Sequence, residues 1–121
     1  MQEINGVRVY ESGEVIELVK GQPPLPNGKS DAAFGYKLQE IDGVLRWTHA
    51  SQEDYKSVVL RLGTPIEEIE ADIQKRLSGR YDCYLSNNAC AGSCAPNLPG
   101  CRGMYYPGTT TILFCGCIGS R

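Results

Sequence analysis

The sequence predicts an α+β protein: two β-hairpins and two helices, followed by a small irregular cysteine-rich module with a short C-terminal strand. Three observations carry this prediction. β-Prone runs flank turn residues before residue 50, apolar residues recur with a helical period between residues 51 and 79, and all six cysteines follow Gly79. A chain of 121 residues can form one ordinary domain, or a small domain with an appended module.

The first expected hairpin lies near the N-terminus. The runs 7–10 and 15–19 are rich in Val and Ile, and they flank the turn-forming residues 11–14. This arrangement is typical of two antiparallel strands. Residues 21–28 follow with three prolines and two glycines, so we expect a partly extended loop there.

The second expected hairpin has a stronger signal. Residues 34–41 and 44–48 are separated by Asp42 and Gly43. A two-residue Asp-Gly turn between apolar runs matches the backbone twist that joins antiparallel strands.

Two helices are expected next. Residues 51–62 carry a possible Ser cap and one apolar face, and Gly63 ends the helix. Thr64 and Glu67 form a T-x-x-E capping box in which proline takes the first helical position. Residues 66–77 then carry a narrow apolar stripe.

Charge and hydropathy exclude several classes of protein. The net charge of −2 excludes a broadly basic nucleic-acid binder, and Glu67, Glu68 and Glu70 would face phosphates if the second helix entered a DNA groove. No apolar run reaches the length of a membrane span. The N-terminus shows no basic region followed by an apolar run, so we expect synthesis in the cytoplasm without a Sec-type signal. Export of the cysteine-rich part is left open.

The composition of the chain changes at Gly79. Residues 1–79 hold 9 Lys/Arg and 13 Asp/Glu without cysteine, whereas residues 80–121 hold 3 Lys/Arg, one Asp and all six cysteines. The second segment is too poor in aliphatic residues to build a core alone, so it needs crosslinks or a metal. We therefore expect a recognition or carrier segment over 1–79 and a crosslinked or metal-binding module over 80–121.

Six cysteines are the crosslink or ligand candidates: Cys83, Cys90, Cys94, Cys101, Cys115 and Cys117. Only residues 109–114 between them have the pattern of a strand, and this strand would project Cys115 and Cys117 to the same face. We expect these two cysteines to bind two separate partners or to share one metal. A first possibility is a disulfide framework, for which 15 pairings exist and which persists only in an oxidising compartment.

A second possibility is a cytosolic accessory protein that binds zinc or an iron–sulfur cluster through four thiolates. The ligand candidates are Cys90, Cys94, Cys115 and Cys117, although their spacing lacks the usual C-x2-C knuckles. His49 could add a ligand, but a single histidine at a strand end is more often a surface residue.

A third possibility is enzymatic crosslinking. The acidic helix over residues 64–79 precedes a segment rich in Cys, Ser, Thr and Gly, such as residues 87–94 and 109–117. This layout resembles the precursors of ribosomally made, post-translationally modified peptides, although the boundary is not a double glycine. The resemblance implies a maturation enzyme as partner and thioethers between Cys and hydroxyl side chains. The acceptors would be Ser86, Ser93, Thr109, Thr110, Thr111 and Ser120.

Nothing in the sequence indicates catalysis. The chain has one histidine, no thioredoxin-like C-x-x-C and no P-loop, dinucleotide-binding or zinc-protease motif. We therefore expect a non-enzymatic protein in which a leader-like or recognition segment carries a crosslinked module. An alternative is a small subunit that a larger complex holds by its cysteine-rich tail. The contact anchors would then be Tyr84, Tyr105, Tyr106 and Phe114.

Overall fold

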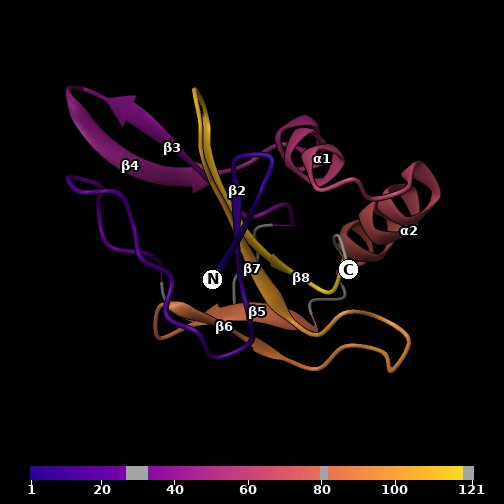
Figure 1. The fold of residues 1–121 in the computed structure, drawn as a ribbon. Coiled ribbons are helices and arrows are strands. Elements are labelled where there is room, and N and C mark those ends of the chain that lie inside the picture. Colours follow the sequence, from indigo (N-terminus) through magenta and orange to yellow (C-terminus); the bar gives the residue numbers. More distant parts are fainter. Residues whose placement is uncertain (27–32, 80–81, 119–121) are drawn as a thin grey trace.

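The computed structural model describes residues 1–26, 33–79 and 82–118. These residues form an α+β fold, which confirms the predicted fold class (Figure 1). The strands are β1 (Gln2–Ile4), β2 (Val7–Tyr10), β3 (Tyr36–Ile41), β4 (Val44–His49), β5 (Cys83–Ser86), β6 (Ala89–Gly92), β7 (Arg102–Pro107) and β8 (Thr111–Gly116). The helices are α1 (Gln52–Arg61) and α2 (Ile66–Leu77).

One antiparallel sheet holds six of the strands in the order β1-β2-β7-β8-β3-β4. Strands β7 and β8, which follow Gly79, lie between β2 and β3, which precede it. The predicted segments 1–79 and 80–121 therefore share a sheet, and neither completes it alone. Strands β5 and β6 form a separate two-stranded hairpin.

The central strands β7 and β8 are covered on both faces. Met104 and Phe114 belong to the apolar cluster that contains the buried residues of α1 and α2. Tyr105 and Leu113, which point the opposite way because side chains alternate along a strand, belong to a second cluster with three buried cysteines. Figure 1 shows the helices and the β5–β6 hairpin on different sides of β7 and β8, so the fold has three layers.

The first predicted hairpin is half wrong. Residues 7–10 form a strand, but their partner is β1 rather than residues 15–19, which form no strand. The turn is Asn5-Gly6, and both residues have positive φ, at 49° and 85°. Asn-Gly is among the strongest two-residue hairpin signals, so it outweighs the longer turn at residues 11–14.

Residues 11–16 instead lie along the cysteine-bearing hairpin. The backbone N–H of Gly13 donates to the carbonyl of Cys90 at 3.0 Å, and that of Ile16 donates to the carbonyl of Asn88 at 2.8 Å. The side chain of Ile16 is buried against the β5–β6 layer. This segment therefore ties the N-terminal part of the chain to the cysteine-rich part.

The second predicted hairpin and the first predicted helix are confirmed. The turn residues Asp42 and Gly43 have φ of 52° and 78°, which is the geometry expected of a two-residue turn. Ser51 caps α1 in a reciprocal capping box with Asp54. Residues 21–26 of the proline-rich segment form no helix or strand, as predicted, and residues 27 and 28 lie outside the described ranges.

The second helix is confirmed but its predicted cap is wrong. Pro65, with ψ of 143°, takes the extended N-cap position, so α2 begins one residue later than predicted. Thr64 is then one position too early to cap the helix. Its hydroxyl is buried and has no hydrogen-bond partner among the described residues.

The cysteine-rich segment is more regular than its composition predicts. The one predicted strand, residues 109–114, corresponds to β8 at 111–116, and β5, β6 and β7 were not predicted. Their short runs of Ala, Gly, Tyr and Cys lack the alternation of polar and branched apolar residues that marks a strand in sequence.

We predict a large penalty for adding a side chain at Gly35. A Cβ there would lie 2.3 Å from the carbonyl oxygen of Leu113 and 2.5 Å from the Cβ of Phe114, and φ is +83°. Gly13 is the matched control, because its φ is +81° but a Cβ meets nothing within 4 Å. In urea unfolding, Gly13→Ala should cost about 1 kcal/mol and Gly35→Ala at least about 2 kcal/mol more. Equal losses would contradict the tight packing of β3 onto β8.

Candidate functional site

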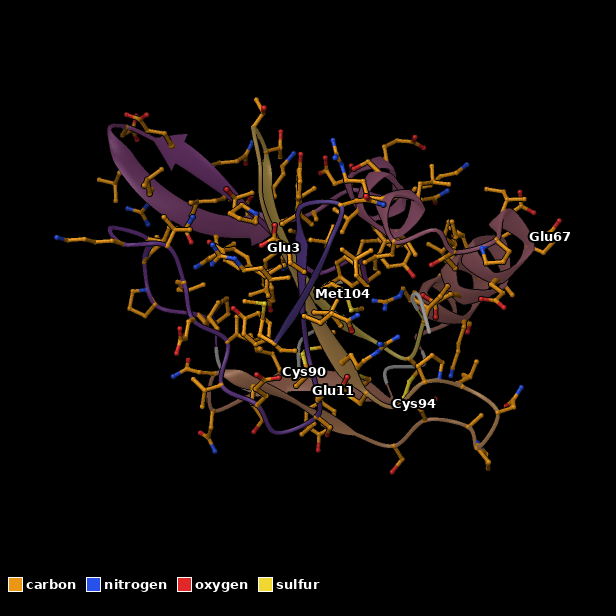
Figure 2. The ribbon with its side chains drawn as sticks, viewed as in Figure 1. Glu3, Glu11, Glu67, Cys90, Cys94 and Met104 are labelled. Atoms are coloured by element: carbon orange, nitrogen blue, oxygen red, sulfur yellow. A yellow bond between two sulfur atoms is a disulfide. The ribbon has the colours of Figure 1, made fainter. Side chains whose placement is uncertain are left out.

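All six cysteines are paired in disulfides, and no cysteine in the chain is free. The pairs are Cys83–Cys101, Cys90–Cys115 and Cys94–Cys117, with Cα–Cα distances of 5.5, 5.7 and 5.7 Å. As one of the two predicted possibilities states, Cys115 and Cys117 therefore bind two separate partners. Figure 2 shows Cys90 and Cys94 on the side of the central strands that faces β5 and β6.

The β5–β6 hairpin presents the sulfur atom of Cys90 to the six-stranded sheet. Its turn residues Asn87 and Asn88 have φ of 51° and 63°, a conformation that asparagine tolerates. This turn places Leu85 opposite Cys90, and both are buried against β7 and β8. The inner face of the hairpin therefore consists mainly of the side chain of Leu85 and the disulfide-bonded sulfur of Cys90.

A glycine makes room for the innermost disulfide. Gly103 lies opposite Cys115 in the β7–β8 ladder. A Cβ at Gly103 would lie 3.0 Å from the Sγ of Cys90 and 2.9 Å from the Cδ1 of Ile16. Glycine at this position therefore leaves room for the Cys90–Cys115 bridge, and a larger residue would force Ile16 and the Cys90 sulfur to shift.

The disulfides also restrict the unfolded chain. They join residues separated by 18, 25 and 23 positions. Closing a loop of about that size removes unfolded-state entropy worth roughly 3 kcal/mol in the chain-entropy model. This constraint stabilises a segment that has few aliphatic residues of its own.

The four predicted metal ligands belong to two of the disulfides. Cys90 and Cys94 are bonded to Cys115 and Cys117, and a disulfide sulfur is not the thiolate that binds zinc or iron. No group of three or more potential ligands occurs among the described residues. His49 ends β4, as predicted, where its ring packs edge-on against Tyr36 with the ring centroids 5.9 Å apart.

The predicted hydroxyl acceptors are spread over the module. Ser86 ends β5, and Ser93 lies between β6 and Cys94. Thr109 and Thr110 are exposed in the β7–β8 turn, and Thr111 begins β8. All six sulfurs are bonded to one another, so none is available for a thioether in this form. Ser120 lies outside the described residues.

The predicted contact anchors are mostly inside the fold. Tyr105 and Phe114, which are 0% and 2% exposed, belong to the two apolar clusters, so they cannot anchor a partner as predicted. Tyr84 and Tyr106 are half-buried. Strands β7 and β8 of the cysteine-rich segment therefore lie at the centre of the sheet, and the segment is not a free tail.

A buried arginine, which the sequence analysis did not single out as a site, joins the layers. Arg76 of α2 donates from Nε to Asp72 at 2.6 Å, and its terminal nitrogens donate to the carbonyls of Ala33 at 3.1 Å and Cys115 at 2.9 Å. Its guanidinium also stacks on the ring of Tyr55, 4.5 Å from the centroid. One side chain thus connects α1, α2, β8 and a disulfide-bonded residue.

Burial controls the ionisation of this cluster. The loss of solvent raises the pKa of the Tyr55 phenol far above its ordinary value, so the phenol stays neutral and its O–H donates a hydrogen bond to the carboxylate of Asp72. Asp72 and Arg76 stand four residues apart on α2, a spacing that brings their side chains together. No local sequence pattern indicates that Arg76 is buried, because its burial depends on packing against β8.

An open pocket lies beside the outermost disulfide. It has a volume of about 270 Å³ and lies between α2 and the loop at Asn97 and Leu98, with Cys117 and Ile118 at its base. Glu68 and Lys75 lie among its lining residues. Its volume lies just below the range of about 300–1,000 Å³ that is usual for small-ligand sites.

Comparison with known proteins gives one relative over the full length. The chain is 32% identical over 118 residues to the uncharacterized protein YozP of Bacillus subtilis (strain 168), and the match covers 96% of this chain and 99% of YozP. The chain belongs to the YozP family. No family model and no solved structure matches the chain. Because the match with YozP runs on both sides of Gly79, the two segments occur together in both proteins.

We predict that removing the buried guanidinium is costly. Arg76→Met leaves Asp72 and two carbonyls without their donor, so unfolding should require about 3–5 kcal/mol less free energy. Lys75→Met is the matched control, because Lys75 pairs with Asp82 at the surface, and it should cost about 1 kcal/mol or less. Urea unfolding with the disulfides intact measures both. Similar costs for the two variants would show that Arg76 does not join the layers.

We also predict an order of reduction for the disulfides. Cys90 and Cys115 are 1% and 9% exposed, whereas each of the other bridges contains one half-exposed cysteine. Limited treatment with a thiol, followed by alkylation and peptide mass analysis, should therefore find the Cys90–Cys115 bridge reduced last. Reduction of this bridge before the other two would contradict its position over Gly103.

Proposed function

We propose that this member of the YozP family is a non-enzymatic, disulfide-stapled protein that presents its crosslinked segment, residues 80–121, on a sheet completed by residues 1–79. The observation that carries the proposal is the pairing of all six cysteines into three disulfides next to the central strands. Of the chemistries that the sequence left open, the disulfide framework agrees best with this arrangement.

The layered fold supports a recognition or carrier role for residues 1–79. Strands β2 and β3 hold β7 and β8 in place from both sides, and residues 11–16 bond to the β5–β6 hairpin. The loops of the module, residues 93–100 and 108–110, then extend from a fixed frame. Binding residues are commonly displayed in this way, on loops positioned by a rigid sheet.

A non-enzymatic role agrees with the use of the buried ionisable groups. Tyr55, Asp72 and Arg76 direct their hydrogen bonds to one another and to backbone carbonyls. Groups bonded in this way stabilise packing, which supports a structural role for them. Neither helix of the described residues has the length and apolar character that a bilayer crossing needs.

Under this proposal, the three disulfides determine the compartment in which the protein is stable. Three structural disulfides persist in an oxidising compartment and are rare where thioredoxin and glutathione keep thiols reduced. We therefore propose that the protein acts outside the reducing cytoplasm, and that its partner is a protein bound by the module rather than a nucleic acid.

The proposal is tested by the intact mass of protein purified from its native source. We expect the mass to be lower than that of the reduced chain by two hydrogens for each of three disulfides, about six mass units. Reductant should restore the missing mass, and alkylation without reductant should add nothing. Metal content is measured on the same sample.

Two results would overturn the proposal. Six alkylatable thiols with about one zinc or iron per chain would favour the metal-binding alternative. A mass deficit that persists after reduction would favour enzymatic crosslinking and the precursor-peptide hypothesis.

A further inference from the structure

The β3–β4 hairpin continues beyond the rest of the sheet. Strand β3 pairs with β4 along its whole length, but it pairs with β8 only at Tyr36 and Lys37. Residues 38–47 therefore form a two-stranded ribbon that has no third strand among the described residues. Figure 1 shows this ribbon projecting from the body of the protein. A two-stranded ribbon is marginally stable in water by itself, so this one should gain from another strand.

The end of the ribbon is apolar and exposed. Ile41, Val44 and Leu45 are 41%, 51% and 41% exposed. Strand β4 is the edge of the six-stranded sheet, is six residues long and contains no proline and one Lys or Arg, Arg46. The opposite edge, β1, has three residues and is too short to pair with a long strand. Long, apolar and unguarded edge strands are templates for pairing with another chain.

The geometry of the turn fixes which backbone groups face outward. In a hairpin with a two-residue turn, the residues next to the turn, Ile41 and Val44, exchange hydrogen bonds. The pattern then alternates, so Arg46 bonds to β3, whereas the N–H and C=O groups of Leu45 and Trp47 point away from it. A strand added to β4 must therefore bond to Leu45 and Trp47.

We propose that a second copy of this chain supplies that strand, with β4 pairing antiparallel to the partner's β4 about a two-fold axis at Leu45. Because the outward-facing hydrogen-bonding groups occur at every second residue of β4, each symmetric register places one residue of β4 directly opposite the same residue of the partner. An axis at Arg46 would place two guanidinium groups opposite each other, which is unfavourable. An axis at Trp47 would bring the partner strand against Pro23. The Pro23 carbonyl accepts a hydrogen bond from the indole Nε1 of Trp47 at 3.1 Å, so this residue lies beside the strand.

The register at Leu45 is also favourable in charge and apolar contact. It places Leu45 opposite the partner's Leu45 and Val44 opposite the partner's Arg46. The partner's Arg46 then lies one turn of the hairpin away from Asp42, and opposite charges on neighbouring elements attract. Leu45 of each copy then meets its counterpart at the axis on one face of the sheet, Val44 lies beside the axis on the other face, and the two ribbons become one four-stranded sheet. Such a contact is small, so we expect a weak, concentration-dependent dimer.

Charge substitutions at the axis test the proposal, using the whole disulfide-bonded chain. Sedimentation velocity of the wild type over a concentration series should show a monomer–dimer equilibrium. Leu45→Lys and Leu45→Glu each place like charges at the axis, so each should raise the dimer dissociation constant about tenfold or more. An equimolar mixture of the two variants should dimerise again, because lysine then faces glutamate. Val15→Lys is the control, since Val15 is 59% exposed in a different segment.

The outcomes separate this contact from any other. Dimers in the wild type, in Val15→Lys and in the mixture, with monomers in each Leu45 variant alone, support the proposal. A wild type that stays monomeric at all concentrations overturns it, as does a dimer that both Leu45 variants retain. Circular dichroism and the disulfide mass confirm that each variant is folded. Because the mixture must restore the dimer, misfolding of one variant cannot imitate the supporting result.

Discussion

The structure depends on a central hairpin, β7–β8, that is covered on both faces. Side chains alternate along these strands, so Met104 and Phe114 pack on the helices while Tyr105 and Leu113 pack on the cysteine-bearing layer. Each face needs a cover that the chain supplies from a different region. The helices come from before Gly79 and the β5–β6 hairpin comes from after it, which is why neither half of the chain can hold the central strands alone.

Cysteine takes the place of aliphatic residues in the β5–β6 hairpin, which covers one face of the central strands. The inner face of the β5–β6 hairpin offers little apolar surface, with Leu85 as its aliphatic residue in the cluster, so transfer of apolar area from water holds it only weakly. Disulfides add stability by restricting the unfolded chain, and their sulfur atoms fill the interior like small apolar groups. Arg76 extends this constraint to the other face, because its guanidinium bonds to the carbonyl of Cys115 from the helix side.

The elements that the sequence predicts correctly are those with local signals. Asp42-Gly43 defined the second hairpin, and the capping pair Ser51 and Asp54 defined α1. The first hairpin has a different partner strand from the one predicted, because Asn5-Gly6, an equally local signal, forms its turn. Disulfide pairing and the burial of Arg76 depend on which strands meet in the sheet. The sequence therefore predicts which residues carry the crosslinks but leaves 15 pairings open.

The central claim is that three particular disulfides attach a thin layer to the central strands. A peptide map of the native protein, digested without reductant after free thiols are blocked, tests it most directly. The account predicts three linked peptide pairs, joining Cys83 to Cys101, Cys90 to Cys115 and Cys94 to Cys117. A bridge between Cys115 and Cys117, a free thiol at Cys90 or any exchange of partners would contradict it.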